Sequence, residues 1–164
     1  MVIILVLIVI TGVLFSCIKV VPQTQNYIIE RLGVYRAVWT PGLHILFPVI
    51  DRVAGKVDMK EWLLEIPLQP VITKDSKTVR IKMDAYLQVV DPRLFTYAIG
   101  NDVRAVEQLT TATLRNVVGE LGLEETLTSR EMIQMKMLFA LQEATRPWGI
   151  KFHRIELQNV LPSA

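Results

Sequence analysis

The stretch TVRIKMDAYLQVVDP, residues 78–92, decides the fold of this chain. Apolar and polar side chains alternate along it, and a period of two predicts a β-strand that packs one face against a core. Asp91-Pro92 ends the predicted strand, because proline has no backbone N–H to donate to a neighbouring strand. The side chains expected to face the core are Val79, Ile81, Met83, Ala85, Leu87 and Val89.

The residues before this strand predict a β-rich region. Short apolar runs bounded by turn-forming residues are typical of strands. Leu32-Gly33 is the expected tight turn between the first two strands, and Pro67 separates the last two. The four predicted strands are residues 25–31, 34–38, 61–66 and 70–74.

After Gly100 the apolar residues recur three and four apart, which predicts helices. The first is expected to run from an N-cap at Asn101 to Gly122. The second begins at Thr128 or Ser129 and ends near Arg146. The stripe of the second helix that is expected to face the sheet is Met132, Met135, Phe139 and Gln142.

A last strand is predicted from Ile150 onward. Ile150 and Phe152 alternate in one phase, whereas Ile155 and Leu157 alternate in the other. A β-bulge near His153 would bring both pairs to one face. Strands followed by two main helices and a closing strand predict an α+β fold, with an antiparallel β-sheet subdomain before an α/β subdomain.

The N-terminal segment, residues 1–18, carries no ionisable side chain, and Lys19 ends the run. As a helix, these residues would rise roughly 27 Å, close to the bilayer's hydrocarbon thickness of about 30 Å. We therefore expect a transmembrane anchor at 1–18 and one domain at 19–164. Lys19, Arg31 and Arg36 lie on the C-terminal side of the span, which predicts a single-pass cell-membrane protein whose domain faces the cytoplasm.

Two other interpretations of this segment are a cleaved signal peptide and a lipoprotein signal that ends at Cys17. The apolar run has no Lys or Arg ahead of it, which favours a retained span over a signal peptide. Cys17 is also a candidate for reversible palmitoylation, because cysteines beside a membrane boundary are common sites of that modification.

Residues 43–49 are unusually apolar for a stretch that contains Pro48. They predict either a buried core strand or a segment that lies against the bilayer beside the anchor. In the second case, Trp39 and His44 would occupy the polar boundary, where amphipathic rings are favoured. The candidate membrane-contacting residues are Trp39, Leu43, Ile45, Leu46 and Phe47.

Composition excludes several classes of protein. The net charge is only +2 and the basic residues are interspersed with acidic ones, which argues against nucleic-acid binding. A single cysteine, Cys17, excludes an intrachain disulfide and a cysteine-based zinc site. His44 and His153 have no second metal ligand at a suitable spacing, and no nucleophile–base pair or phosphate loop is evident. We expect no enzyme activity, cofactor or metal.

Four blocks of the sequence resemble the stomatin, prohibitin and flotillin family, also called SPFH or band 7. They occur in family order and cover nearly the whole chain after the predicted anchor. The resemblance is greatest to the bacterial stomatin-like proteins and paraslipins. The blocks are VVPQTQNYIIERLGVYRAVWTPGLHILFPVIDRV at 20–53, VITKDSKTVRIKMDAYLQVVDP at 71–92, LTTATLRNVVGELGLEETLTSRE at 109–131 and ATRPWGIKFHRIELQNV at 144–160.

The resemblance implies a non-catalytic, membrane-anchored scaffold that forms homo-oligomers and organises lipid microdomains. It also implies partners among membrane proteases or membrane proteins of the NfeD type, and a first subdomain wedged at the bilayer surface. Family members typically continue into a long coiled-coil helix, whereas this chain stops at Ala164. Two alternatives from other classes are a secreted lipoprotein with a ligand-binding domain and a membrane-associated hydrolase.

Overall fold

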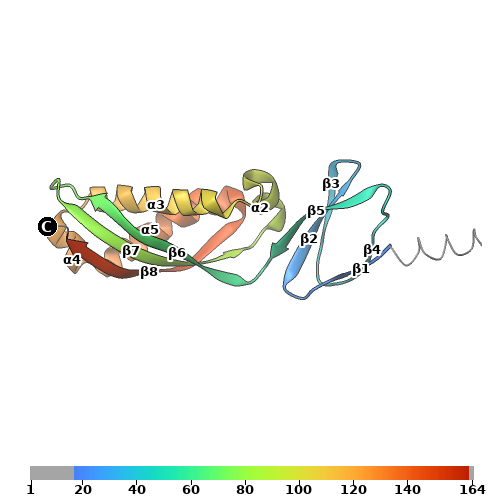
Figure 1. The fold of residues 1–164 in the computed structure, drawn as a ribbon, viewed down its shortest axis with the longest axis horizontal. Helices are drawn as coiled ribbons and strands as arrows, with labels where there is room; N and C mark the ends of the chain where they lie inside the picture. Colours follow the sequence, from blue (N-terminus) through green and yellow to red (C-terminus); the bar gives the residue numbers. More distant parts are fainter. Residues whose placement is uncertain (1–16, 163–164) are drawn as a thin grey trace, which may run out of the picture. The chain divides into compact units, whose positions relative to one another are not determined.

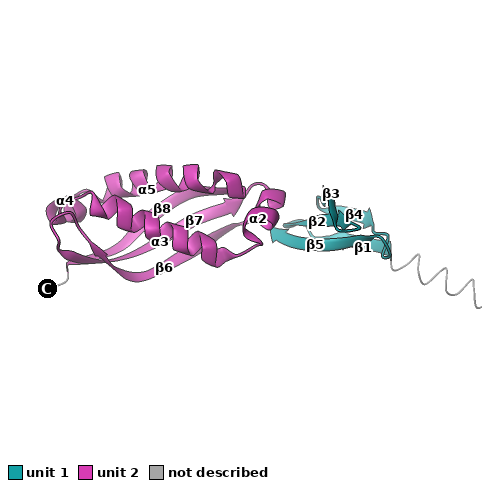
Figure 2. Ribbon diagram, turned by 90° about the horizontal axis from the view of Figure 1, so that it is seen from above, with its two compact units in different colours: residues 1–59 teal, residues 60–164 magenta. Residues whose placement is uncertain are grey.

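The computed structural model describes residues 17–162, and the chain divides into two compact units, Met1–Met59 and Lys60–Ala164 (Figure 2). The predicted anchor lies outside the described residues, apart from Cys17 and Ile18. Within residues 17–162, every helix is too short or too polar to cross a membrane.

The first unit consists of two antiparallel sheets (Figure 1). A two-stranded sheet pairs β1 (Ile18–Val21) with β4 (Gly42–Ile45). A three-stranded sheet has the order β3-β2-β5, with β2 at Gln25–Arg31, β3 at Val34–Trp39 and β5 at Asp51–Asp58. The core of this unit contains Val21, Tyr27, Ile29 and Leu46, against which Trp39 and Val53 pack.

The predicted hairpin of β2 and β3 is confirmed. Leu32 and Gly33 connect the strands with φ angles of 51° and 84°. Two successive positive φ angles are typical of the tight turn whose twist matches that of the flanking strands.

The second unit is one antiparallel sheet of order β6-β7-β8, with helices over one of its faces (Figure 2). The two long helices are α3 (Val103–Gly119) and α5 (Arg130–Thr145), and they contact each other. Helix α3 packs on β6 and helix α5 packs on β8. The remaining elements are β6 (Glu61–Ile72), β7 (Thr78–Val89), β8 (Ile150–Pro162), α2 (Pro92–Ile99), α4 (Leu123–Thr128) and the 3₁₀ turn η1 (Arg146–Trp148).

The alternating strand that decides the fold is confirmed as β7. All six of its predicted core side chains are buried, with exposed fractions between 0% and 2%. The bulge near His153 is confirmed as well. Tyr86 pairs with Arg154 and Leu87 pairs with Phe152, which leaves His153 as the extra residue of β8. The bulge brings Ile150, Phe152, Ile155 and Leu157 to the buried side.

Several boundaries differ from the prediction. Strand β6 is continuous through Pro67, because a bulge between Ile66 and Gln69 absorbs the proline. Helix α2 was not predicted: Asp91 caps it by accepting hydrogen bonds from the backbone N–H groups of Arg93 and Leu94. Helix α3 starts one residue later than expected, after the N-cap Asp102.

Of the four predicted core residues of α5, three are wrong. Gln142 does face the sheet, because its Nε2 donates to the carbonyl oxygen of Phe152 at 3.0 Å. Met135 and Phe139 are 72% and 70% exposed, and Met132 is 38% exposed. This helix carries apolar residues on all sides, so its sequence period does not select one face. The side chains that it buries are Ile133, Met137, Leu141 and Thr145.

Candidate functional site

The two-stranded sheet of the first unit carries an exposed apolar face. Ile18 lies opposite Ile45, and Val20 lies opposite Leu43. Directly paired residues point to the same side of a sheet, so these four side chains form one surface. All four are more than half exposed: Ile18 by 52%, Val20 by 67%, Leu43 by 75% and Ile45 by 65%. We refer to Ile18, Val20, Leu43 and Ile45 as the apolar face.

The opposite side of this sheet faces the core of the unit. The backbone N–H of Leu46 donates to the carbonyl oxygen of Cys17 at 2.7 Å, which extends the pairing of the two strands by one step. Both of these residues are only 8% exposed. Leu46 was a predicted membrane contact, but its side chain belongs to the core. Palmitoylation of Cys17 stays a prediction, and it would require the buried thiol to become accessible.

The loop between β4 and β5 continues the exposed apolar surface. Phe47 is 52% exposed and Val49 is 91% exposed. The backbone N–H of Leu32 donates to the carbonyl oxygen of Ile50 at 2.9 Å, which fixes the β2–β3 turn against this loop. Leu32 is itself 78% exposed. We refer to residues 47–50 as the apolar loop.

Sequence analysis missed Leu32 as a member of this surface, although the sequence carries a signal for it. Leu32 occupies a turn position with a φ of 51°, where glycine or asparagine is usually favoured. A bulky apolar residue at a strained and solvent-exposed position is poorly explained by folding alone. Val20 was missed because its exposure depends on strand pairing and not on composition, whereas Ile18 and Val49 lie in segments that were considered as membrane contacts.

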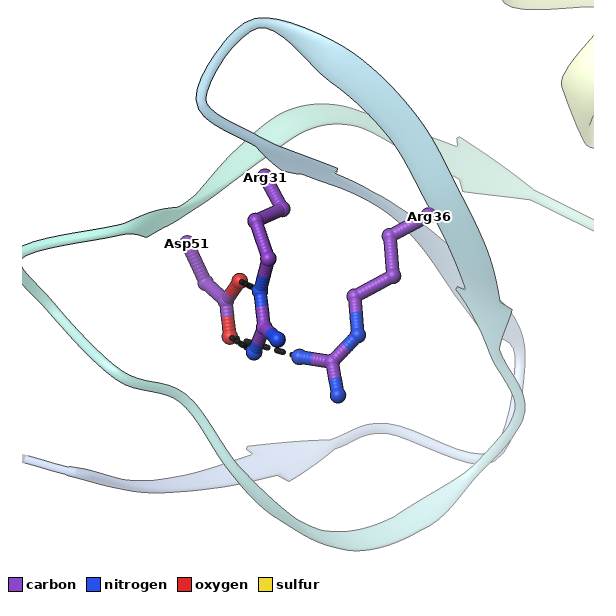
Figure 3. Close-up of polar contacts among 3 residues, drawn as sticks. All are labelled: Arg31, Arg36 and Asp51. Carbon is purple, nitrogen blue, oxygen red and sulfur yellow. Dashed lines mark hydrogen bonds and ion pairs between the residues drawn. The ribbon is translucent and has the colours of Figure 1, made fainter.

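A buried carboxylate, that of Asp51, follows the apolar loop directly and accepts hydrogen bonds from two arginines (Figure 3). Arg31 donates to Asp51 from Nε at 2.7 Å and from Nη2 at 3.0 Å, and Arg36 donates from Nη1 at 2.8 Å. The Asp51 side chain has no exposed surface. Hydrogen bonding from Arg31 is the main cause that lowers the pKa of Asp51 below its ordinary value. The carboxylate therefore stays ionised and ties β5 to β2 and β3.

The main chain of Asp51 connects this ion cluster to the apolar loop. Its N–H donates to the carbonyl oxygen of Phe47 at 2.7 Å, and the N–H of Ile50 donates to the same oxygen at 3.1 Å. These bonds close the loop into a compact turn. The charged cluster thus fixes the position of Phe47 and Val49 next to the sheet.

The two predicted boundary rings lie together. The rings of Trp39 and His44 stack with their centroids 4.7 Å apart and their planes within 9°. Nε2 of His44 is 2.7 Å from the carbonyl oxygen of Thr40, so it donates a hydrogen bond to that oxygen. Trp39 also packs against the core of the first unit.

Residues 17–162 contain no group of three or more His, Cys, Asp or Glu side chains that could hold a metal ion. Nε2 of His153 lies 3.2 Å from Oε1 of Gln88, on the exposed side of the second unit. What the first unit presents is an apolar surface that can bind lipid or protein by hydrophobic burial.

Comparison with known proteins gives consistent matches. The model of the SPFH domain / Band 7 family matches residues 19–164. An uncharacterized protein of Mycobacterium tuberculosis is 44% identical over 150 residues, which is 92% of this chain and 39% of that protein. A stomatin homolog of Pyrococcus horikoshii is 36% identical over 147 residues, covering 90% of this chain and 55% of the homolog.

A stomatin-like protein of Caenorhabditis elegans is 35% identical over 149 residues, covering 90% of this chain and 46% of the relative. The chain therefore spans about two fifths to just over half of the length of these relatives. The family model covers all of the sequence after residue 18. Together with the α+β fold and its antiparallel sheets, these matches show that the chain belongs to the SPFH domain / Band 7 family.

Proposed function

We propose that this protein is a non-catalytic, membrane-associated scaffold whose first unit rests on the bilayer. In this proposal, residues 1–18 anchor the chain by one span and the folded part lies on the cytoplasmic side. Copies of the chain associate with one another, organise lipid microdomains, and modulate membrane partner proteins such as proteases or proteins of the NfeD type. Family membership supports the membrane-associated scaffold at this general level.

The observation that carries the proposal is the apolar face. Fully burying a Val, Leu or Ile side chain is favourable by about 1.5–3 kcal/mol, so four such side chains left in water represent a substantial loss of stability. That loss is recovered if the surface meets lipid. The face also begins at Ile18, the first residue of β1, so the uncharged span would end one residue earlier than predicted and lead directly into the face.

A second group of exposed apolar side chains also supports membrane contact by the first unit. Leu32, Phe47 and Val49 are all more than half exposed, and they project from a turn and a loop that are hydrogen-bonded to each other. The loop is held by the Asp51 cluster, so its shape does not depend on lipid. A preformed apolar surface loses little conformational entropy when it binds a membrane.

Fluorescent labelling of single cysteines tests the membrane contact. In full-length protein carrying Cys17→Ser, we place one cysteine at Ile45 or at Ile72, label it with an environment-sensitive dye and reconstitute the protein into phosphatidylcholine–phosphatidylglycerol vesicles. The two positions are matched, because both are isoleucines with exposed fractions of 65% and 64%. We expect a blue shift and quenching by nitroxide lipids at position 45 but not at position 72. Equal quenching at both positions, or none at 45, would contradict the proposal.

The anchor and the self-association have separate tests. An intact N-terminal mass together with resistance to carbonate extraction supports a retained span, whereas a mature protein that begins with a lipidated Cys17 supports the lipoprotein alternative. Crosslinking in native membranes followed by sizing measures association. A strictly monomeric protein would refute the scaffold.

A further inference from the structure

The outer surface of α5 presents an apolar stripe. Met132, Met135 and Phe139 are three and four residues apart, so they lie on one side of the helix. A shallow groove of about 320 Å³ runs beside the stripe, between α5 and β8, and Met135, Leu138 and Ile155 are among its lining residues. We refer to Met132, Met135 and Phe139 as the α5 stripe. No part of residues 17–162 covers it, since Met135 and Phe139 remain about 70% exposed.

Two charges of opposite sign flank the α5 stripe. Glu131 lies in the first turn of the helix, and Arg146 follows its last residue with helical φ and ψ of −53° and −44°. They are about four turns apart, so both lie on the side of the helix that carries Met135. Both are exposed, and among the described residues neither forms an ion pair.

This arrangement is self-complementary. The midpoint between Glu131 and Arg146 falls between Leu138 and Phe139, inside the apolar region. If a second α5 packs antiparallel with a two-fold axis at that midpoint, Glu131 of each copy lies opposite Arg146 of the other. Two-fold interfaces pair each residue in this reciprocal way, and antiparallel helices commonly pack through such stripes.

We propose that two copies of this chain associate through their α5 helices, packed antiparallel about a two-fold axis at Leu138-Phe139. Met135 and Phe139 fill the centre, and the groove beside Met135 receives an apolar side chain of the other copy. Glu131–Arg146 pairs close the two ends. The inference rests on the self-association in the proposed function and assigns it a surface. Anchoring both copies in one membrane raises their effective concentration, so a small interface suffices.

Charge reversal provides the test, using the full-length protein in mild detergent. We expect Glu131→Arg and Arg146→Glu each to raise the dimer dissociation constant about tenfold or more. Either change puts two like charges opposite each other at both ends of the interface, because the two-fold axis repeats the 131–146 contact. Combining the two changes should restore wild-type association. The matched control is Arg115→Glu, which reverses an exposed charge on α3 and should leave the dissociation constant unchanged. Sedimentation equilibrium measures it, and circular dichroism verifies that each variant is folded.

A disulfide test examines the position of the axis. In the Cys17→Ser background, Phe139→Cys should give a covalent dimer upon oxidation, whereas Arg115→Cys should not. Failure of the double charge reversal to restore association would overturn the inference, as would a dimer that persists in Phe139→Asp. Either result would leave oligomerisation through another surface, and hence the scaffold, intact. A wild-type chain that is monomeric would overturn both the inference and the self-association, whereas the labelling at Ile45 reports on membrane contact alone.

Discussion

The Oδ2 atom of Asp75 accepts a hydrogen bond of 3.0 Å from the backbone N–H of Leu123. A side chain from the β6–β7 turn therefore caps the start of α4, far along the chain. The same contact explains the glycine before the helix, because a Cβ on Gly122 would lie only 2.7 Å from that oxygen. Helix α4 thus begins where a tertiary partner satisfies its first backbone donors.

Removing this cap is expected to destabilise the second unit. Asp75→Ala should lower the free energy of unfolding by about 1 kcal/mol, as is typical for loss of a helix N-cap. Asp75→Asn keeps an oxygen acceptor and should lose less than half of that. Urea denaturation followed by far-UV circular dichroism measures both. Equal losses for the two variants would show that the charge, which both remove, dominates over the hydrogen bond that only Asn can keep.

The ion cluster of the first unit predicts a specific pH dependence. The pKa of Asp51 lies below its ordinary value of 3.8, chiefly because Arg31 donates hydrogen bonds to the carboxylate. A group whose folded-state pKa is lowered contributes stability that is complete above its unfolded-state pKa and disappears as the pH falls through its folded-state pKa. The difference in free energy of unfolding between the protein and Asp51→Asn should be constant near neutrality and shrink below about pH 4.

Chemical denaturation at a series of pH values measures this difference. Asp75→Asn is the control, because it removes an aspartate outside the ion cluster. Its difference in free energy of unfolding shows how much of the pH dependence is unrelated to Asp51. A difference for Asp51→Asn that persists undiminished to strongly acidic pH would mean that hydrogen-bond geometry, and not ionisation, makes the contribution.

The two faces of α5 predict effects of very different size for the same substitution. Met137 is fully buried, so Met137→Ala should lower the free energy of unfolding by about 2–5 kcal/mol. Met135 is 72% exposed, so Met135→Ala should change it by at most about 0.5 kcal/mol. Urea denaturation at low protein concentration, where association does not contribute, compares them. Equal losses would place both methionines in the core.

The bulge in β8 can be tested by deletion. Removing His153 would shift Ile155, Leu157 and Val160 to the wrong side of the sheet or force the strand out of register. We expect a loss of about 3 kcal/mol or more, since several apolar side chains lose their burial. His153→Ala keeps the extra residue and should cost at most about 0.5 kcal/mol. Thermal unfolding distinguishes the two, and a tolerated deletion would show that the register can adapt.

Sequence patterns predicted the features that depend on neighbours along the chain. The alternation in residues 78–89 identified β7 and all of its core side chains, because each face of a strand is read from every second residue. Before His153 the apolar residues fall on even positions and after it on odd positions, and this change predicted the bulge for the same reason. Leu32-Gly33 predicted a hairpin, although nothing local indicated that Leu32 would stay exposed.

Tertiary structure decided which of several equivalent surfaces is buried. Helix α5 is apolar on all sides, so only its packing on α3 and β8 selected Met137 over Met135. Leu46 and Phe47 are neighbours of similar hydrophobicity, yet pairing with Cys17 turned Leu46 into the core. Asp51 gained its low pKa from Arg31 and Arg36 on other strands. The sequence by itself determined the strands β2, β3, β6, β7 and β8, the two long helices and the family, because these depend on local periods and motifs. Strands β1 and β5 were not predicted, since they have no comparable local pattern. Burial and charge pairing depend on which distant side chains meet, and only the folded chain brings those together.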